Sequence, residues 1–302
     1  MKDIIIIGGG PAGLTAAMYA GRAQLDTLVL EKQFQGGQMM NTNEVENYPG
    51  ILQTTGPELS SVMYEHASQF GTQMAYEEVV GIEVSESIKK VITTTETYET
   101  KTIILAMGAK PRQLGVEKEQ DLWGRGVSYC AICDGGFFRD KEVAVVGGGD
   151  TAVEDALYLS RLAKKVYLIH RRDELRATQI LQQRILASNV EIIWDSKVTK
   201  LYSEQALTGI EVTNIKTNQV KDIDIQGLFI AVGSVPATSL VSGHVSLNEQ
   251  GYIIAGENCE TNVEGVFAAG DIRQKELRQI VTAASDGAVS VYQAEKYILT
   301  RQ

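Results

Sequence analysis

The chain has 302 residues, 44% of them hydrophobic, and a formal net charge of −10. Its length predicts about two domains, each with a core of its own, and its acidic balance argues against a nucleic-acid-binding surface. Glycine is abundant and proline scarce, 29 residues against 5, so we expect many glycines where the backbone turns tightly or approaches a ligand.

The first predicted elements are a strand, a helix and a second strand. Residues 4–7 are consecutive isoleucines, which is typical of a strand buried on both faces of a parallel sheet. Pro11 suits the first turn of a helix, and residues 27–30 predict the next strand. The isoleucine run is too short for a signal peptide, and no apolar stretch of about 18 residues follows. We therefore expect no membrane segment and a cytoplasmic location.

A glycine-rich turn joins the first strand to the helix, with Gly8, Gly10 and Gly13 in the pattern G-x-G-x-x-G. In a dinucleotide-binding unit these glycines permit the tight turn, the approach of the pyrophosphate and the packing of the helix on the strand. Glu31 ends the second strand, where a carboxylate accepts hydrogen bonds from a ribose. The pattern predicts a dinucleotide site that suits FAD, with a purely structural glycine turn as the alternative.

The same unit recurs in the middle of the chain. A predicted strand over residues 142–146 and a predicted helix over residues 151–162 flank a turn that carries Gly147 and Gly149. Ala152 takes the third place of the pattern, which tolerates alanine because that position governs packing. We therefore predict a second dinucleotide site.

Basic residues replace the acid at the end of this unit. The second strand ends in His170, Arg171 and Arg172, and Arg176 follows about one turn later. Guanidinium groups bind a 2′-phosphate through paired hydrogen bonds, whereas a carboxylate would repel it. The pattern predicts NADPH rather than NADH, and the alternative is a solvated arginine face.

Three further apolar strands end in glycine, at Gly108, Gly233 and Gly270-Asp271. The third belongs to neither repeat, so we expect the chain to return and complete the first domain. The predicted fold class is α/β, with two Rossmann-like three-layer nucleotide-binding domains, the second inserted in the first. The expected domains are residues 1–113 with 245–302, which bind FAD, and residues 114–244, which bind NADPH and carry the cysteine pair.

Cys130 and Cys133 form a C-x-x-C pair that is followed directly by Asp134. A zinc site needs about four ligands, and no other cysteine or histidine stands in ligand spacing. Inert buried thiols are a second alternative. The spacing favours a redox-active disulfide and no metal. Asp134 is placed to move a proton during thiol exchange or, alternatively, to cap a helix, and we expect Cys259 to be structural.

Together these elements resemble the bacterial low-molecular-weight thioredoxin reductases over nearly the whole chain. The motifs that carry the resemblance lie at residues 8–13, 36–38, 45–50, 130–134, 147–152, 170–176, 267–271 and 278–284.

The resemblance adds detail to the two predicted nucleotide sites. It implies FAD contacts at Gly8, Gly10, Pro11, Ala12, Gly13, Glu31, Gly37, Gln38, Asn47, Val79, Gly108, Gly270, Asp271, Arg278 and Gln279. It implies NADPH contacts at Gly147, Gly149, Asp150, Thr151, Ala152, His170, Arg171, Arg172 and Arg176.

The resemblance also implies a homodimer and a thioredoxin as the protein substrate. Hydride would pass from NADPH to FAD, and electrons would then pass to the disulfide and on to thioredoxin. In this scheme Cys133 faces the flavin, Cys130 attacks the partner's disulfide and Asp134 is the acid. Because nicotinamide and disulfide must take turns at the flavin, we expect the inserted domain to rotate about segments near Leu114 and Val245.

Other functions of the same fold stay open at this point. A ferredoxin-linked disulfide reductase would not need the arginines, and a ferredoxin–NADP reductase would not need the cysteine pair. Another NADPH-dependent flavin disulfide reductase would keep both features. A non-catalytic redox sensor that binds nucleotides is an alternative of a different class.

Overall fold

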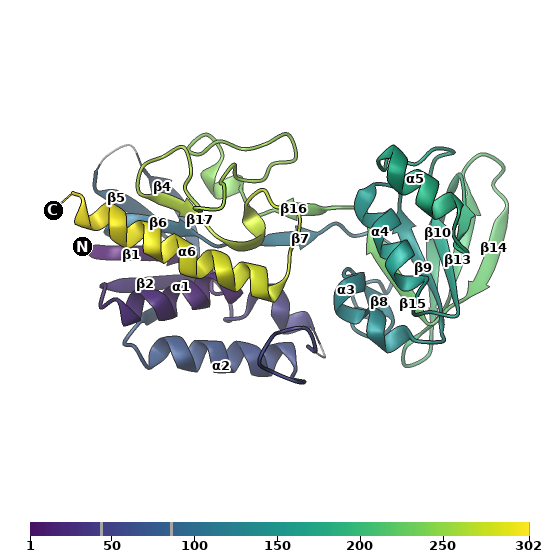
Figure 1. Cartoon of the computed structure of the whole chain (residues 1–302), viewed down its shortest axis with the longest axis horizontal. Coiled ribbons are helices and arrows are strands. Elements are labelled where there is room, and N and C mark those ends of the chain that lie inside the picture. The colour runs from purple at the N-terminus through teal and green to yellow at the C-terminus, as the bar shows by residue number, and fades with distance from the viewer. Residues whose placement is uncertain (43–44, 85–86, 302) are drawn as a thin grey trace. The chain divides into compact units, whose positions relative to one another are not determined.

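The computed structural model describes residues 1–42, 45–84 and 87–301. The described chain forms two compact units, residues 1–110 with 235–302 and residues 111–234 (Figure 1). The second unit is one continuous stretch of chain, whereas the first is built from both ends.

The first unit contains a mixed seven-stranded sheet. Six strands lie in the order β3-β2-β1-β6-β5-β4, and β17 pairs with β6 away from this path. The strands β3, β2, β1, β6 and β17 run parallel, while β5 pairs antiparallel with β6 and with β4. The strand bounds are β1 (Lys2–Ile7), β2 (Thr27–Glu31), β3 (Gln73–Tyr76), β4 (Val79–Glu83), β5 (Lys89–Thr93), β6 (Thr97–Leu105) and β17 (Val266–Ala268).

Buried isoleucines account for the central strand of this sheet. Ile4 to Ile7 of β1 are each at most 4% exposed, as a strand covered on both faces requires. Ile4 and Ile6 belong to one apolar cluster, and Ile5 and Ile7 to another, because successive side chains point to opposite faces. The prediction of a two-face-buried strand is therefore confirmed.

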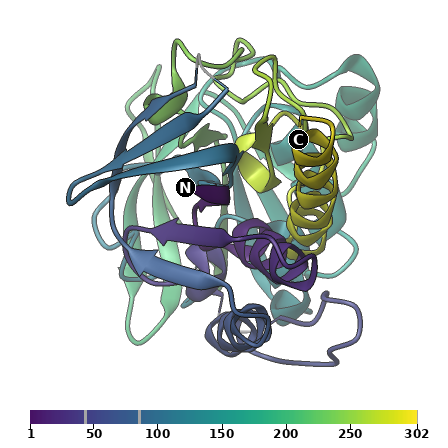
Figure 2. The same cartoon turned by 90° about the vertical axis from the view of Figure 1, so that its left-hand side faces the viewer.

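Helix α6 (Ile280–Leu299) packs against α1 (Pro11–Arg22), and Figure 2 shows the yellow helix beside the purple one. Their approach depends on a glycine, since a Cβ atom on Gly287 would lie 2.3 Å from the carbonyl oxygen of Ala12. Helix α2 (Gly56–Ser68) begins at a capping box between Thr55 and Glu58. The remaining helical turns are η1 (Gly37–Asn41), η3 (Ser239–Val241) and η4 (Gly270–Ile272).

The second unit contains a parallel five-stranded sheet in the order β11-β10-β9-β15-β8 and an antiparallel sheet β12-β13-β14. The strand bounds are β8 (Val127–Ser128), β9 (Glu142–Gly147), β10 (Lys165–Ile169), β11 (Glu191–Ile193), β12 (Ser196–Ser203), β13 (Leu207–Asn214), β14 (Val220–Asp224) and β15 (Gly227–Ala231). The helices are α3 (Ala131–Asp134), η2 (Gly135–Phe138), α4 (Asp150–Leu159) and α5 (Gln179–Leu186).

The chain passes between the units twice, through β7 (Ala109–Pro111) and β16 (Ser234–Pro236), which pair as a two-stranded sheet. The unit boundaries fall at residues 110/111 and 234/235 rather than at the expected 113/114 and 244/245. Residues 235–244 lie with the first unit because Val241 is fully buried in the same apolar cluster as Val245.

The structure confirms the fold-class prediction, including the return of the C-terminal segment. Strand β17 pairs in register with β6 of the first sheet, with Phe267 opposite Ile104. Among the described residues, none of the helices combines the length and apolar character needed to cross a bilayer.

Candidate active site

The first glycine loop connects β1 to α1, and its glycines meet different constraints. Gly8 has a φ of +109°, and a Cβ atom there would lie 2.4 Å from the carbonyl oxygen of Ala106. A Cβ atom on Gly13 would lie 1.8 Å from the carbonyl oxygen of Gly8. By contrast, the space beside Gly10 is open, since a Cβ atom would meet only Gly37 Cα, 4.0 Å away. Gly8 and Gly13 thus serve the turn and the helix packing, and Gly10 leaves its side of the loop accessible.

The side chain of Glu31, at the end of β2, accepts hydrogen bonds from one backbone amide of this loop and from one that follows β2. Its Oε2 accepts a hydrogen bond of 2.8 Å from the Gly9 amide, and its Oε1 accepts one of 3.1 Å from the Gln33 amide. Because a carboxylate has about four acceptor positions, these two bonds leave capacity for ribose hydroxyls.

A second loop of the first unit lies against the first. Gly36 donates its amide to the carbonyl of Gly9 at 2.7 Å, and Gly37 begins η1 with a φ of +56°. Gln38 donates a side-chain hydrogen bond to the carbonyl of Ala109. Gly37, one of the residues expected to contact FAD, therefore lies beside the glycine loop.

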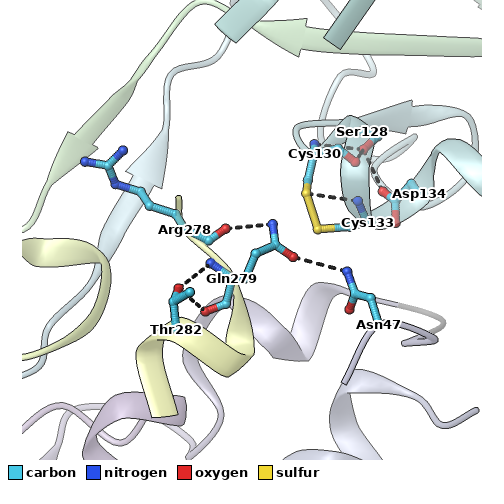
Figure 3. Close-up of a disulfide and its surroundings, with 8 residues drawn as sticks. All are labelled: Asn47, Ser128, Cys130, Cys133, Asp134, Arg278, Gln279 and Thr282. Atoms are coloured by element: carbon cyan, nitrogen blue, oxygen red, sulfur yellow. Dashed lines mark hydrogen bonds between the residues drawn. A yellow bond between two sulfur atoms is a disulfide. The ribbon is translucent and has the colours of Figure 1, made fainter. Parts of the chain in front are cut away.

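Asn47 and Gln279 come together although they are far apart in sequence. Asn47 Nδ2 donates to Gln279 Oε1 at 3.1 Å, and Gln279 Nε2 donates to the carbonyl of Arg278 at 2.8 Å (Figure 3). The backbone amide of Gln279 donates to Thr282 Oγ1 at 3.0 Å, and Gln279 is the N-cap of α6, whose first residue is Ile280. Val79, another residue expected to contact FAD, is the first residue of β4, where it pairs with Thr93 of β5.

Three buried polar side-chain atoms of the first unit have no hydrogen-bond partner among the described residues. They are Oγ of Ser60, in α2, Oδ1 of Asp271, in η4, and Nε of Arg278, which precedes α6. Burial raises the pKa of Asp271, while the positive charges of Lys275 and Arg278 act in the opposite direction. Since buried polar groups are rarely left unpaired, the atoms of Asp271 and Arg278, two residues expected to contact FAD, point to a polar ligand in this unit.

The second glycine loop connects β9 to α4 in the second unit. Gly147 has a φ of +157°, and a Cβ atom on Gly148 would lie 2.1 Å from the ring of His170. Apart from Gly149 itself and its chain neighbours, no atom of the described residues lies within 4 Å of the Gly149 Cβ position, so this loop also leaves one glycine accessible. Asp150, the first residue of α4, accepts a hydrogen bond of 2.7 Å from the Thr178 amide.

His170 and the three arginines differ in burial. His170 is 4% exposed, and burial holds its pKa below the ordinary value, aided by the charges of Arg176 and Arg172. Arg171, Arg172 and Arg176 are exposed. The backbone amide of Arg176 donates to the carbonyl of Gly148 at 2.7 Å, which ties the arginine segment to the glycine loop.

Cys130 and Cys133 form a disulfide with a Cα–Cα distance of 5.3 Å. Cys130 is the N-cap of α3, and its sulfur accepts a hydrogen bond of 3.2 Å from the Cys133 amide (Figure 3). Both cysteines are half-buried, and Ile132 between them is 46% exposed. Because Cys130 caps the first turn of α3, the backbone amide that its sulfur accepts favours a thiolate there after reduction.

Ser128 connects Asp134 to the disulfide segment by hydrogen bonds (Figure 3). The Ser128 hydroxyl donates to Asp134 Oδ2 at 2.6 Å and accepts from the Cys130 amide at 3.0 Å. Burial raises the pKa of Asp134, and the Ser128 hydrogen bond opposes that shift. The arrangement gives the carboxyl group a greater tendency to hold a proton than an exposed aspartate has.

The structure adds polar residues near the disulfide that the sequence did not indicate. Besides Ser128, Glu119 is 3% exposed and accepts from the amides of Leu114 and Gly115 at 2.9 and 2.8 Å. It also accepts from the hydroxyl of Tyr129 at 2.7 Å, directly before Cys130. No spacing rule marks these residues, because their contacts follow from the fold of the loop.

The third cysteine, Cys259, is separate from the pair. It is fully buried, and burial raises the pKa of its thiol to about 12, which makes it a poor nucleophile. The described residues contain no group of three or more His, Cys, Asp or Glu side chains that could hold a metal ion.

Comparisons with known proteins agree with these features. The family model for pyridine nucleotide-disulphide oxidoreductases matches residues 2–287. The thioredoxin reductase of Bacillus subtilis (strain 168) is 45% identical over 298 residues, which cover 98% of this chain and 94% of that protein. That of Listeria monocytogenes (serovar 1/2a, strain EGD-e) is 47% identical over 298 residues, which cover 98% and 93%.

Solved structures extend the match to three dimensions. The thioredoxin reductase from Streptococcus pyogenes MGAS5005 superimposes with a TM-score of 0.94 at 47% identity and covers 99% of both chains. That from Lactococcus lactis, in its FR conformation, gives 0.70 at 45% identity and covers 99% of this chain and 100% of the other. The chain therefore belongs to the pyridine nucleotide-disulphide oxidoreductase family, and within it to the thioredoxin reductases.

Proposed function

We propose that this chain is an NADPH-dependent thioredoxin-disulfide reductase that uses FAD and relays electrons through Cys130 and Cys133. The disulfide on the unit with the second glycine loop is the observation that carries the proposal. A nucleotide carrier alone would need no such pair, whereas a disulfide reductase needs one to exchange with its protein substrate.

The residues of the first unit fit FAD. Gly10 leaves room for a pyrophosphate, and the N-terminus of α1 supplies favourable amide groups beside it. Asp271 offers a buried, unpartnered carboxylate oxygen to the ribityl hydroxyls, and Arg278 an unpartnered Nε. The set proposed to hold FAD is Gly8, Gly10, Pro11, Ala12, Gly13, Glu31, Gly37, Gln38, Asn47, Val79, Gly108, Gly270, Asp271, Arg278 and Gln279.

The residues of the second unit fit NADPH. Gly149 leaves the pyrophosphate position open, and the exposed arginines can pair with a 2′-phosphate without any change in packing. The set proposed to hold NADPH is Gly147, Gly149, Asp150, Thr151, Ala152, His170, Arg171, Arg172 and Arg176. Bound at these residues, FAD would supply a two-electron carrier between the nicotinamide and the Cys130–Cys133 disulfide.

The chain's own residues then carry the exchange with thioredoxin. The Cys130 thiolate attacks one sulfur of the thioredoxin disulfide, which forms a mixed disulfide and displaces one thioredoxin thiolate. Cys133 attacks the Cys130 sulfur, re-forms the internal disulfide and releases the second thiolate. Asp134, whose pKa burial raises, gives a proton to a leaving thiolate and recovers it from solvent.

Two segments join the units, β7 and β16, and we propose that the second unit rotates about them during turnover. This motion would let the nicotinamide and the disulfide reach the flavin in turn and would then expose the dithiol to a protein partner. We further propose a homodimer in the cytoplasm, where a reducing environment supports dithiol chemistry.

The test of the function is Cys130→Ser. We expect it to reduce thioredoxin turnover to background while NADPH still bleaches the visible absorbance of bound flavin under anaerobic conditions. The buried Cys259 provides the control, since Cys259→Ala should keep full turnover. If Cys130→Ser reduces thioredoxin at the normal rate, the proposed relay is wrong.

A further inference from the structure

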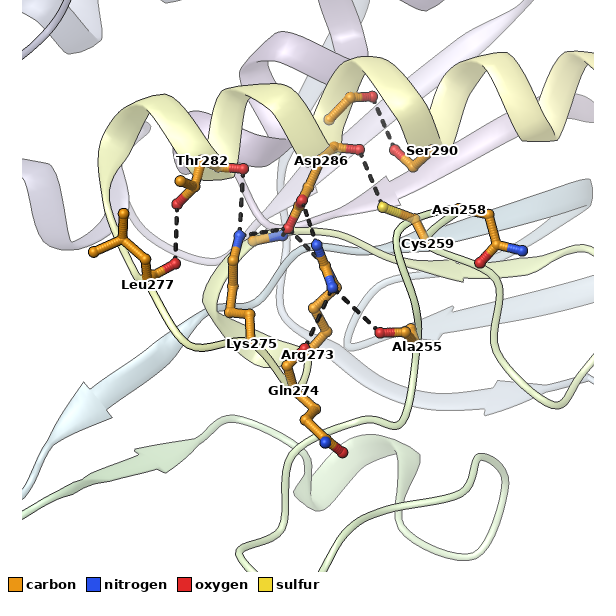
Figure 4. Close-up of polar contacts among 12 residues, drawn as sticks. Ala255, Asn258, Cys259, Arg273, Gln274, Lys275, Leu277, Thr282, Asp286 and Ser290 are labelled. Carbon is orange, nitrogen blue, oxygen red and sulfur yellow. Dashed lines mark hydrogen bonds and ion pairs between the residues drawn. The ribbon is translucent and has the colours of Figure 1, made fainter. Parts of the chain in front are cut away.

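Asp286 of α6 stands at the centre of a buried group of charged residues that the proposed chemistry does not use (Figure 4). It is 5% exposed, and its Oδ2 accepts hydrogen bonds from the Gly270 amide at 2.9 Å, Arg273 Nε at 2.8 Å and Lys275 Nζ at 2.8 Å. Its Oδ1 accepts a fourth from Arg273 Nη2 at 2.8 Å. The side chains of Arg273 and Lys275 are also buried, at 6% and 8% exposure.

These bonds reach both sides of Asp271. Gly270 precedes it, and Arg273 and Lys275 follow it in the loop that leads to α6. Gly270 itself has a φ of +79°, and a Cβ atom there would lie 2.9 Å from the Cβ of Ala12, in the first turn of α1. Asp286 therefore anchors to α6 the segment that carries Asp271, whose Oδ1 has no hydrogen-bond partner among the described residues.

The two cations that Asp286 binds, Arg273 and Lys275, differ in how many other acceptors they have. Lys275 and Arg278 act on Asp271, whereas Arg273 has its guanidinium occupied by Asp286 and by the carbonyls of Ala255 and Gln274. Lys275 has a flexible stem, and apart from Asp286 it donates only to the carbonyl of Thr282, at 3.3 Å, among the described residues. Without the Asp286 charge, the buried ammonium of Lys275 would need another anion.

We propose that Asp286 is a positioning residue for FAD binding: by holding Lys275 and the 270–275 loop, it keeps the carboxylate of Asp271 free for the ribityl chain. This inference rests on the proposed function in one respect, namely that Asp271 faces FAD. Asp286 acts through other residues and touches neither cofactor nor substrate in this scheme.

The test measures the dissociation constant of FAD from the apoprotein by quenching of flavin fluorescence. In Asp286→Asn, Lys275 should pair with Asp271, and the dissociation constant should rise about tenfold or more. In the double variant Asp286→Asn with Lys275→Met, the competing ammonium is gone, and most of the lost affinity should return. A merely structural role predicts the opposite, because the double variant removes yet another buried contact.

Two single variants complete the design. Lys275→Met alone should keep the dissociation constant within about twofold of the original protein, and it remains informative if Asp286→Asn does not fold. Ile298→Val, at the other end of α6, should lower thermal stability without altering FAD affinity, since Ile298 is buried in the α1–α6 core.

The outcomes separate this inference from the function. Equal FAD affinity in Asp286→Asn, failure of the double variant to recover affinity, or loss of affinity in Lys275→Met alone would each overturn the role of Asp286. If the unsubstituted protein binds FAD but does not reduce thioredoxin, the proposed function is wrong and the role of Asp286 in FAD binding is unaffected.

Discussion

Single hydrogen bonds decide the proton chemistry beside the disulfide. Asp134 is buried enough to have a raised pKa, and the Ser128 hydroxyl moderates that shift by stabilising the carboxylate. Ser128 also accepts the amide of Cys130, so one hydroxyl connects the proposed acid to the proposed nucleophile. A substitution of Ser128 alone would therefore remove both hydrogen bonds.

We predict that Ser128→Ala shifts the pH profile of thioredoxin reduction. Removing the hydrogen bond removes the one influence that lowers the pKa of Asp134, so the pKa rises further. Because the protonated carboxyl of Asp134 is the proposed acid, activity should persist to higher pH on the basic limb of kcat/KM. Ser160→Ala is the control and should leave the profile in place, because among the described residues its hydroxyl bonds only to the carbonyl of Leu157. A basic limb that moves to lower pH contradicts the assignment of Asp134.

At the scale of elements, the two β-strand–loop–helix units repeat one solution to binding a dinucleotide. In each unit, neighbouring protein atoms leave no room for a side chain at one glycine, whereas the Cβ position of another glycine is open. A Cβ atom on Gly13 would clash with the carbonyl of Gly8, whereas the Cβ position of Gly10 is open. A Cβ atom on Gly148 would clash with His170, whereas one on Gly149 would meet nothing within 4 Å in the described part of the chain beyond its sequence neighbours.

This contrast predicts different effects for two neighbouring alanine substitutions. Gly148→Ala should lower the free energy of unfolding by about 1–3 kcal/mol, because the methyl group overlaps the buried His170 ring. Gly149→Ala should leave the free energy of unfolding nearly unchanged but weaken NADPH binding, because its methyl group would occupy the place of the pyrophosphate. Urea denaturation and NADPH titration of both variants measure the two effects. Unchanged NADPH affinity in Gly149→Ala would contradict the proposed site.

At the scale of the whole molecule, the two units differ in how the chain builds them. The second unit is one continuous segment, and its two apolar clusters contain only its own residues, such as Val145, Leu168 and Ile230. The first unit needs both ends of the chain, because β17 pairs with β6 and α6 packs on α1.

We predict that residues 111–234 fold when expressed alone and bind NADPH with nearly the affinity of the full chain. The ring centroids of Trp194 and His170 are 6.3 Å apart, so binding at the arginine segment should change tryptophan fluorescence. Residues 1–110 alone should neither unfold cooperatively nor bind FAD, because β17, Asp271 and α6 are missing. Cooperative folding of residues 1–110 would contradict the dependence of the first unit on the C-terminal segment.

Much of the architecture could be predicted because its signals are local. The isoleucines at 4–7, the glycine spacing at 8–13 and 147–149, and the apolar strand before Gly270 each lie within a few residues. The Asp286 group, the Asn47–Gln279 hydrogen bond and the Glu119 contacts could not be predicted in this way. Their partners become neighbours only after distant segments pack together.

The sequence by itself determined the α/β class, the two glycine loops, the cysteine pair and the return of the C-terminal strand, since periodicity and turn chemistry act over short distances along the chain. Only the tertiary structure decided which glycine of each loop is open, that Asp134 is buried beside Ser128, and that one carboxylate on α6 holds the loop around Asp271. Burial and hydrogen-bond geometry depend on which segments meet, and a pattern of neighbouring residues does not contain that information.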